Sequence, residues 1–202
     1  MLEGDTEAYI DTGLDLVPGD LLYFAPTSFL HTAVDYMTVL EYNDASGLVT
    51  TVEEFDHYHF GSDDTTADYQ GLDMRGEVAI LSRNVVIKGN GADDWGGQIL
   101  TADSIEAGSV FRYGETVLEY VEIYNCSHRD TERAALRWED NYDSYGRAIG
   151  VSVHGSLGFG VLVKNSKNVQ IEDLIIAGAR QFGMALESTR NVTVDRALIS
   201  NV

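Results

Sequence analysis

The sequence predicts an all-β protein in which a small antiparallel β module precedes a right-handed parallel β-helix of about 23 residues per coil. Two observations lead to this prediction. The first is an internal repeat, because the pattern of residues 159–171 returns at residues 182–194 with every position shifted by 23. The second is the composition: 20 glycines, only 2 prolines, and many valines, isoleucines and tyrosines favour short strands joined by turns.

Residues 1–72 are expected to form the antiparallel module. Strand-like runs cover residues 20–24, 36–42 and 48–52, and the polar segment 43–47 has the composition of a turn. The second and third runs are therefore predicted to pair as a β-hairpin. The polar stretch 61–70 is expected to be a loop at a domain boundary, which divides the chain into residues 1–72 and 73–202.

The repeat region supplies the expected coils. A third copy of the second half of the repeat occurs at residues 82–87, and a fainter one at residues 117–123. Side chains alternate along a strand, so Val169 and Ile171 are expected to point into the interior. The repeat length then places them beside Val192 and Val194, at the ~4.8 Å spacing of paired strands. Residues 73–202 would hold about five or six such coils.

An asparagine precedes the strand in each copy of the repeat, at Asn84, Asn168 and Asn191. Asparagine tolerates the left-handed backbone conformation that a sharp corner requires. Its amide can also bond to the asparagine of the next coil. These three residues are therefore predicted to form a ladder at one corner of the coils.

The charge of the chain excludes some partners. Aspartate and glutamate number 33 against 13 lysines and arginines, which gives a net charge of −20. Nucleic acid is not an expected partner, because binding phosphates requires a surplus of cations. Anionic membranes and polyanionic sugars are disfavoured for the same reason.

The single cysteine, Cys126, rules out an internal disulfide and a zinc cluster of several cysteines. It favours a reducing compartment only weakly, because large extracellular β proteins often lack disulfides. No run of eighteen apolar residues is present, and the acidic first residues do not resemble a signal peptide. The chain is thus expected to be either cytosolic or a piece of a longer protein.

Several segments resemble a known family. Residues 74–89 are similar to the segment that joins a G-eight domain to a β-helix in fibrocystin and fibrocystin-like proteins. The same join occurs in the cell-migration-inducing hyaluronan-binding protein and its transmembrane relative. Residues 17–20 and 55–61 resemble parts of the G-eight domain, and residues 153–156 resemble a later coil.

The resemblance implies a localisation and a role. Residues 1–72 would be the C-terminal part of a G-eight-like domain, and the chain a part of a larger extracellular or cell-surface glycoprotein. It would act as a rigid spacer or as an adhesive assembly surface. Its partners would be other extracellular or cell-surface proteins or glycans, and the chain itself would not span a membrane. Two alternatives remain open: a hyaluronidase-like enzyme that cleaves glycans, and a non-catalytic carbohydrate-binding module.

Hydrolysis is not expected. Where the hyaluronan-cleaving relatives carry histidines, this chain reads Ala-Leu-Arg-Trp-Glu at 135–139 and Gln-Phe-Gly at 181–183. The resemblance therefore implies the loss of general-base candidates. His154 remains, but strand alternation directs it outward or into a turn, so no residue is assigned a catalytic role.

No cofactor is expected, although calcium is possible at two acidic loops, because hard carboxylate oxygens are its preferred ligands. The first loop contains Asp93 and Asp94, and the second contains Asp140 and Asp143. The alternative is that both loops are simply solvated. The pair His57 and His59, two positions apart on one strand, has the spacing for a metal, or His59 is a structural residue at the end of that strand.

Three aromatic residues near the second acidic loop, Trp138, Tyr142 and Tyr145, are candidates for stacking on sugar rings. Insertions between coils often carry the binding function of a repeat protein. The alternative is that these rings cap the hydrophobic interior. Asn125 begins an Asn-Cys-Ser sequon and is a candidate glycosylation site.

Overall fold

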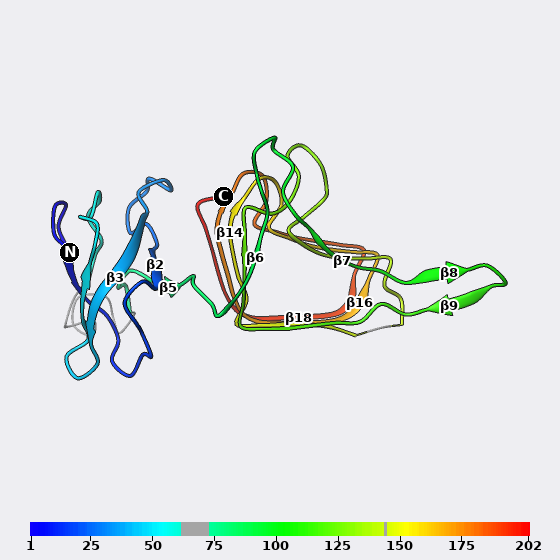
Figure 1. Cartoon of the computed structure of the whole chain (residues 1–202), viewed down its shortest axis with the longest axis horizontal. Coiled ribbons are helices and arrows are strands. Elements are labelled where there is room, and N and C mark those ends of the chain that lie inside the picture. Colours follow the sequence, from blue (N-terminus) through cyan, green and yellow to red (C-terminus); the bar gives the residue numbers. More distant parts are fainter. Residues whose placement is uncertain (62–72, 144) are drawn as a thin grey trace. The chain divides into compact units, whose positions relative to one another are not determined.

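The computed structural model describes residues 1–61, 73–143 and 145–202. These residues form strands joined by turns and no helix (Figure 1), which confirms the all-β prediction. They divide into two compact units, one built from residues 1–82 and one from residues 83–200. The polar loop expected at 61–70 lies, from residue 62 onward, outside the described residues.

The first unit is a five-stranded antiparallel sheet with the strand order β1-β4-β3-β2-β5. Its strands are β1 (Glu7–Tyr9), β2 (Leu21–Phe24), β3 (Asp35–Asn43), β4 (Leu48–Thr51) and β5 (Val78–Ile80). The predicted hairpin is present as β3 and β4, and Gly47 closes its turn with a φ of 73°. Alternate side chains form the core, among them Leu22, Phe24, Met37, Val39 and Phe55.

The first unit extends to Ser82, beyond the boundary expected after residue 72. The reason is β5, which pairs antiparallel with β2 through Leu22 and Ile80. The segment that carries the family resemblance therefore begins inside the antiparallel sheet. The parallel strands start only with β6 (Val85–Lys88).

The second unit is a curled arrangement of parallel strands (Figure 1). A seven-stranded sheet has the order β10-β13-β16-β14-β11-β6, with β18 paired to β16, and a four-stranded sheet has the order β17-β15-β12-β7. The remaining bounds are β7 (Ile99–Thr101), β10 (Thr116–Glu119), β11 (Val121–Tyr124), β12 (Leu136–Glu139), β13 (Gly146–Ile149), β14 (Ser152–Ser156), β15 (Val161–Lys164), β16 (Lys167–Ala179), β17 (Met184–Glu187) and β18 (Arg190–Ser200).

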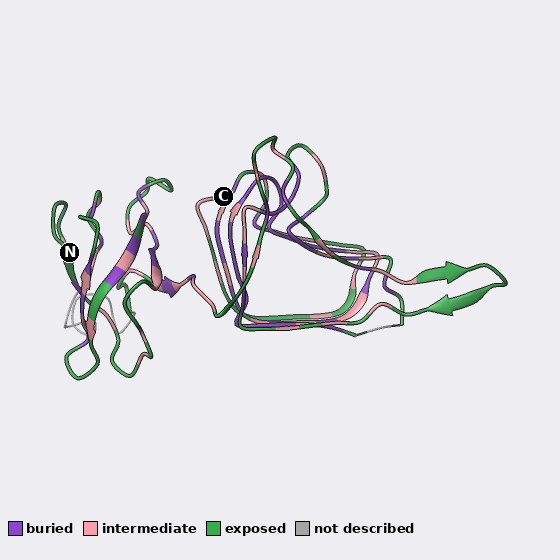
Figure 2. Ribbon diagram, viewed as in Figure 1, coloured by how far each residue is buried: buried purple, intermediate pink, exposed green. Residues whose placement is uncertain are grey.

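The register of the last strands is the predicted one. Val169 pairs with Val192 and Ile171 with Val194, so the offset between paired strands equals that of the sequence repeat. Val169 and Ile171 are buried in a continuous core that includes Trp138. Figure 2 shows this burial along the stacked strands. Earlier pairs are further apart in sequence, because the turns between those strands contain extra residues.

Left-handed residues recur at the corners of the second unit. Tyr120, Gly150, Asp173 and Arg196 follow paired positions of four adjacent strands, and all have a positive φ, between 51° and 61°. At another corner Asn168 and Asn191 have φ values of 60° and 54°. The alignment of these residues turns each successive strand in the same direction.

The asparagine ladder is confirmed for one pair. Asn191 Nδ2 donates a hydrogen bond of 2.8 Å to Asn168 Oδ1. The prediction was wrong for Asn84, because Val85 pairs with Val121 rather than with a residue of the column that contains Val169. Through this pairing Asn84 aligns with Tyr120, at the other corner.

Candidate functional site

The candidate site is built on a corner where the connections between strands differ in length. Residues 102–115 link β7 to β10, and residues 140–145 link β12 to β13, whereas only residues 165–166 link β15 to β16. The longest of these connections contains a hairpin formed by β8 (Ser104–Glu106) and β9 (Val110–Arg112). It projects from the second unit (Figure 1) and is exposed along both strands (Figure 2).

Asp103 fixes the base of this hairpin. Its Oδ1 accepts a 3.0 Å hydrogen bond from the backbone N–H of Gly114. Its Oδ2 accepts hydrogen bonds from the backbone N–H groups of Tyr142, at 2.8 Å, and Asp143, at 3.4 Å. Asn141 Nδ2 also donates to the carbonyl oxygen of Gly114 at 3.2 Å. The two ends of the hairpin are thus tied to the 140–145 connection.

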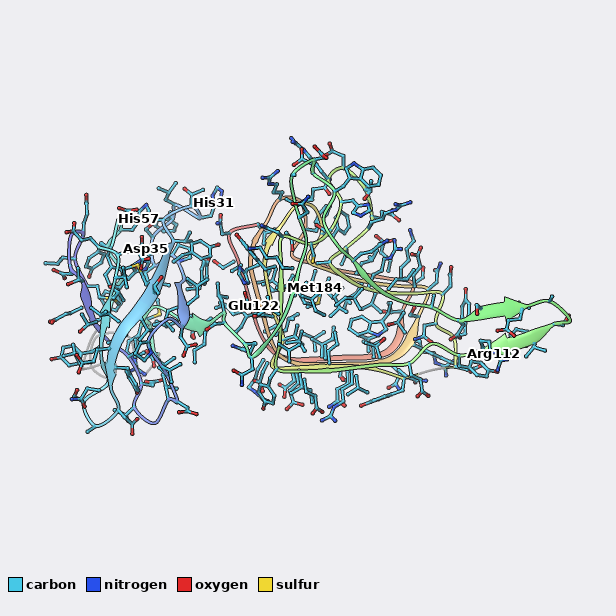
Figure 3. All side chains as sticks on the ribbon, viewed as in Figure 1. His31, Asp35, His57, Arg112, Glu122 and Met184 are labelled. Atoms are coloured by element: carbon cyan, nitrogen blue, oxygen red, sulfur yellow. The ribbon has the colours of Figure 1, made fainter. Side chains whose placement is uncertain are left out.

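A pocket of about 340 Å³ lies between the hairpin and that connection. Apolar and aromatic side chains supply half of its lining and carboxylates most of the remainder: Asp103, Ser104, Ile105, Phe111, Tyr113, Asp140, Tyr142 and Asp143. The large apolar side chains among them are more than half exposed. Figure 3 places Arg112 on the same hairpin, where it pairs with Glu106 on the facing strand.

The electrostatics of the pocket are dominated by the carboxylates. Asp140 Oδ1 accepts hydrogen bonds of 3.2 Å from the Tyr142 hydroxyl and from Asn165 Nδ2. Asp143 Oδ1 lies 2.6 Å from Lys167 Nζ. The hydrogen bond to Asp140 and the negative charge of that residue raise the pKa of the Tyr142 phenol above its ordinary value. Tyr142 is therefore a neutral hydrogen-bonding group at physiological pH.

The structure separates the three aromatic residues proposed for sugar stacking. Tyr142 lines the pocket, whereas Tyr145 donates its hydroxyl to Gln170 Oε1 at 3.0 Å and is not among the lining residues. Trp138 is completely buried, so its assignment to glycan stacking was wrong. It fills the interior beside Gly146, where an added Cβ would collide with the indole ring.

The two acidic loops lie in different surroundings. Asp140 and Asp143 reach the pocket, but Asp93 and Asp94 do not. Asp94 instead receives 2.9 Å ion pairs from Arg129 and Arg180, one on each carboxylate oxygen. The hydrogen bond from Arg129 lowers the pKa of Asp94. No group of three metal-ligating side chains is present in the described part of the chain; calcium binding stays a prediction.

His57 and His59 converge on a residue that the sequence did not single out, Asp35. His57 Nδ1 lies 3.3 Å from Asp35 Oδ1, and His59 Nε2 lies 2.6 Å from Asp35 Oδ2. Figure 3 shows Asp35 and His57 close together in the first unit. His59 is completely buried and also contacts the carbonyl oxygen of Ala25. This arrangement favours the structural interpretation of His59.

His154 lies on the same face as Glu122 and Tyr124, opposite to the interior-facing Val153. Its Nε2 is 2.9 Å from Glu122 Oε1, and its ring stacks on Tyr124 with 4.6 Å between centroids. Burial lowers the pKa of His154, and the hydrogen bond to Glu122 opposes this shift. Only 4% of the residue is exposed, so its ring is withdrawn from solvent.

The sequon at Asn125 occupies a tight corner. Asn125 is half-buried with a φ of 51°, and Ser127 is fully buried, with its hydroxyl accepting a 2.7 Å hydrogen bond from the N–H of Gly158. Glycosylation at Asn125 stays a prediction, and a glycan there would have to leave this corner without displacing Ser127.

No protein-family model matches the chain, and no curated protein matches it significantly. Within the described residues there is also no helix with the length and apolar character needed to cross a membrane.

Proposed function

We propose that this chain is a structural or adhesive segment of an extracellular or cell-surface glycoprotein. In this proposal the second unit is a right-handed parallel β-helix that serves as a rigid spacer or assembly surface. The first unit is the end of a G-eight-like domain, in the order found in fibrocystin and its relatives. The partners are other surface proteins or glycans.

The observation that carries the proposal is the in-register parallel stacking of the second unit. Among its described strands every pair outside the β8–β9 hairpin is parallel, and the last coils pair at the offset of the sequence repeat. In such a stack each coil contacts only its neighbours, so stiffness accumulates along the stacking direction and a continuous outer surface results. A spacer or an assembly surface requires these two properties.

The distribution of charge supports a protein partner of basic character. Residues 1–82 hold 17 of the 33 aspartates and glutamates, and Arg75 is their one lysine or arginine, so their charge is 1 − 17 = −16. Residues 83–202 carry the remaining −4 of the total of −20. A high charge density accelerates association with cationic surfaces and repels anionic ones. Electrostatic attraction would therefore act mainly through the first unit.

The experiment that tests this proposal is surface labelling of the full-length protein in the cells that produce it. An epitope is inserted after Gly61, and antibody binding is compared between intact and permeabilised cells. We expect labelling of intact cells, with a cytosolic marker labelled only after permeabilisation. Labelling that requires permeabilisation would refute the proposed location and the function that depends on it.

A further inference from the structure

We propose that the pocket at the base of the β8–β9 hairpin binds an alkylammonium group. This site is independent of the proposed location of the protein, because it depends only on the geometry of the second unit. The inference rests on three features of the pocket: a preformed base, aromatic walls and a surplus of negative charge.

The base of the pocket is preformed. Asp103 joins the hairpin to the neighbouring loop through three backbone N–H groups, those of Gly114, Tyr142 and Asp143. A carboxylate that is already bonded in this way holds both walls in position without a ligand. Preorganisation of this kind increases affinity, because less conformational freedom is lost on binding.

The walls of the pocket are aromatic and accessible. Phe111, Tyr113 and Tyr142 are each 55–59% exposed, so their rings are accessible to a ligand. They come from two connections that are separate in sequence and meet at one corner. Aromatic faces attract cations through the ring quadrupole, and several rings around one cavity are a known means of holding an alkylammonium group.

The charge of the pocket selects a cation. Asp103, Asp140 and Asp143 are among its lining residues, whereas no lysine or arginine is, and Lys167 pairs with Asp143 from outside the lining. The lining of the pocket therefore has a surplus of negative charge.

The volume and lining of the pocket favour an alkylammonium group over calcium and over a neutral sugar. A volume of about 340 Å³ is at the small end for ligand pockets, which suits one amine or one side chain. Calcium requires six to eight oxygen ligands, whereas Ile105, Phe111 and Tyr113 present carbon to the cavity. A neutral sugar would stack on the rings but would leave the negative charge of the lining unbalanced.

The test is a titration of the whole chain, followed by NMR of its tyrosine and phenylalanine rings. The probes are choline chloride, its neutral carbon isostere dimethylbutanol, and blocked lysine (Nα-acetyl-lysine amide). We expect at least one of the two cations to shift the Tyr142 and Phe111 signals in a saturable way, and dimethylbutanol to bind about tenfold more weakly or not at all. Binding of choline alone would indicate that the natural ligand is a quaternary amine. Binding of blocked lysine alone would indicate that it is a protein side chain.

Variants locate the site. Tyr142→Ala and the isosteric Asp140→Asn should each weaken binding by about fivefold or more. Tyr145→Ala is the matched control, because this exposed tyrosine lies on the same connection but outside the pocket, and it should bind normally. Circular dichroism shows whether each variant retains its β-sheet signal, and Asp140→Asn tests the charge if Tyr142→Ala does not fold.

Four outcomes would overturn the proposal. They are the absence of binding by both cations, binding of dimethylbutanol as tight as that of the tighter-binding cation, equal losses in the Tyr145→Ala control, and saturation of the same signals by calcium or a neutral hexose while neither ammonium probe binds. None of these results bears on surface labelling, so this proposal and the proposed function can fail separately.

Discussion

The imidazole of His59 is held between two acceptors: its Nε2 lies 2.6 Å from Asp35 Oδ2, and its Nδ1 lies 3.0 Å from the carbonyl oxygen of Ala25. Both ring nitrogens of His59 are therefore engaged, and the two contacts together fix the orientation of the imidazole. The His59–Asp35 pair is buried beside the rings of Phe24 and Phe55.

Removal of Asp35 should destabilise the first unit. Asp35→Ala leaves His59 buried without its partner and also frees the backbone N–H groups of Asp56 and His57, which donate to Asp35. We expect a loss of about 3–5 kcal/mol in the free energy of unfolding, as found for broken buried pairs. Urea unfolding followed by circular dichroism measures it. Asp15→Ala, at an exposed aspartate of the same unit, is the control, and an equal effect there would contradict the assignment.

His154 should make the second unit less stable in acid. Burial holds its pKa in the folded state below the ordinary value of about 6.5, so the unfolded chain binds the proton more tightly. The stabilising contribution is complete above pH 6.5 and is lost as the pH falls through the folded-state pKa. His154→Gln keeps a hydrogen-bonding group but does not titrate. Unfolding free energies measured between about pH 7.5 and 5 should fall less steeply in the variant, and identical slopes would refute this prediction.

The corner asparagines can be tested with a pair of substitutions. Asn168 is half-buried rather than buried, so its amide contributes less than a fully buried bond. Asn168→Ala loses the hydrogen bond from Asn191 and places alanine at a φ of 60°, which should cost about 2 kcal/mol. Asn168→Gly loses the same bond but accepts the backbone conformation, so we expect only about 1 kcal/mol. Thermal denaturation measures both effects. A lower melting temperature for Asn168→Gly than for Asn168→Ala would contradict the left-handed geometry.

Cleavage of hyaluronan or polygalacturonate is not expected. The net charge of −20 repels anionic polymers, and His154 is withdrawn from solvent beside Glu122. The full-length protein is incubated with each polymer, with and without millimolar calcium, and polymer length is followed by gel electrophoresis. Shortening of a polymer that disappears in His154→Ala would establish the enzyme alternative in place of the structural one.

The register of the last parallel strands could be predicted from the sequence because the repeat between residues 159 and 194 contains no insertion. The same reasoning failed for Asn84, whose local sequence resembles the repeat but whose strand lies in another column. Sequence similarity over so short a segment identifies a strand and its preceding turn. It does not identify the column of paired strands to which the strand belongs, since that depends on the lengths of all intervening turns.

The positions of Trp138, the pocket and Asp35 were not predicted correctly, because they depend on burial or on contacts between residues distant in the sequence. The alternation that buries Leu136 also buries Trp138, and this signal was available, but the neighbouring acidic residues suggested a surface position. The pocket could not be predicted, because Phe111 and Tyr142 are distant in the sequence and meet only through the stacking of two unequal connections. Asp35 was missed because nothing in its own strand indicates that His57 and His59 would reach it.

The corner that carries the β8–β9 hairpin accommodates the unequal connections 102–115, 140–145 and 165–166 between strands that nevertheless remain in parallel register. The length of the connection at this corner is therefore uncoupled from the parallel pairing of the strands. In evolution such a corner can gain, lose or exchange segments while the interior residues stay under constant selection for packing. For protein engineering it is a natural graft point, where residues 104–112 can be replaced by a foreign recognition loop on an unchanged framework.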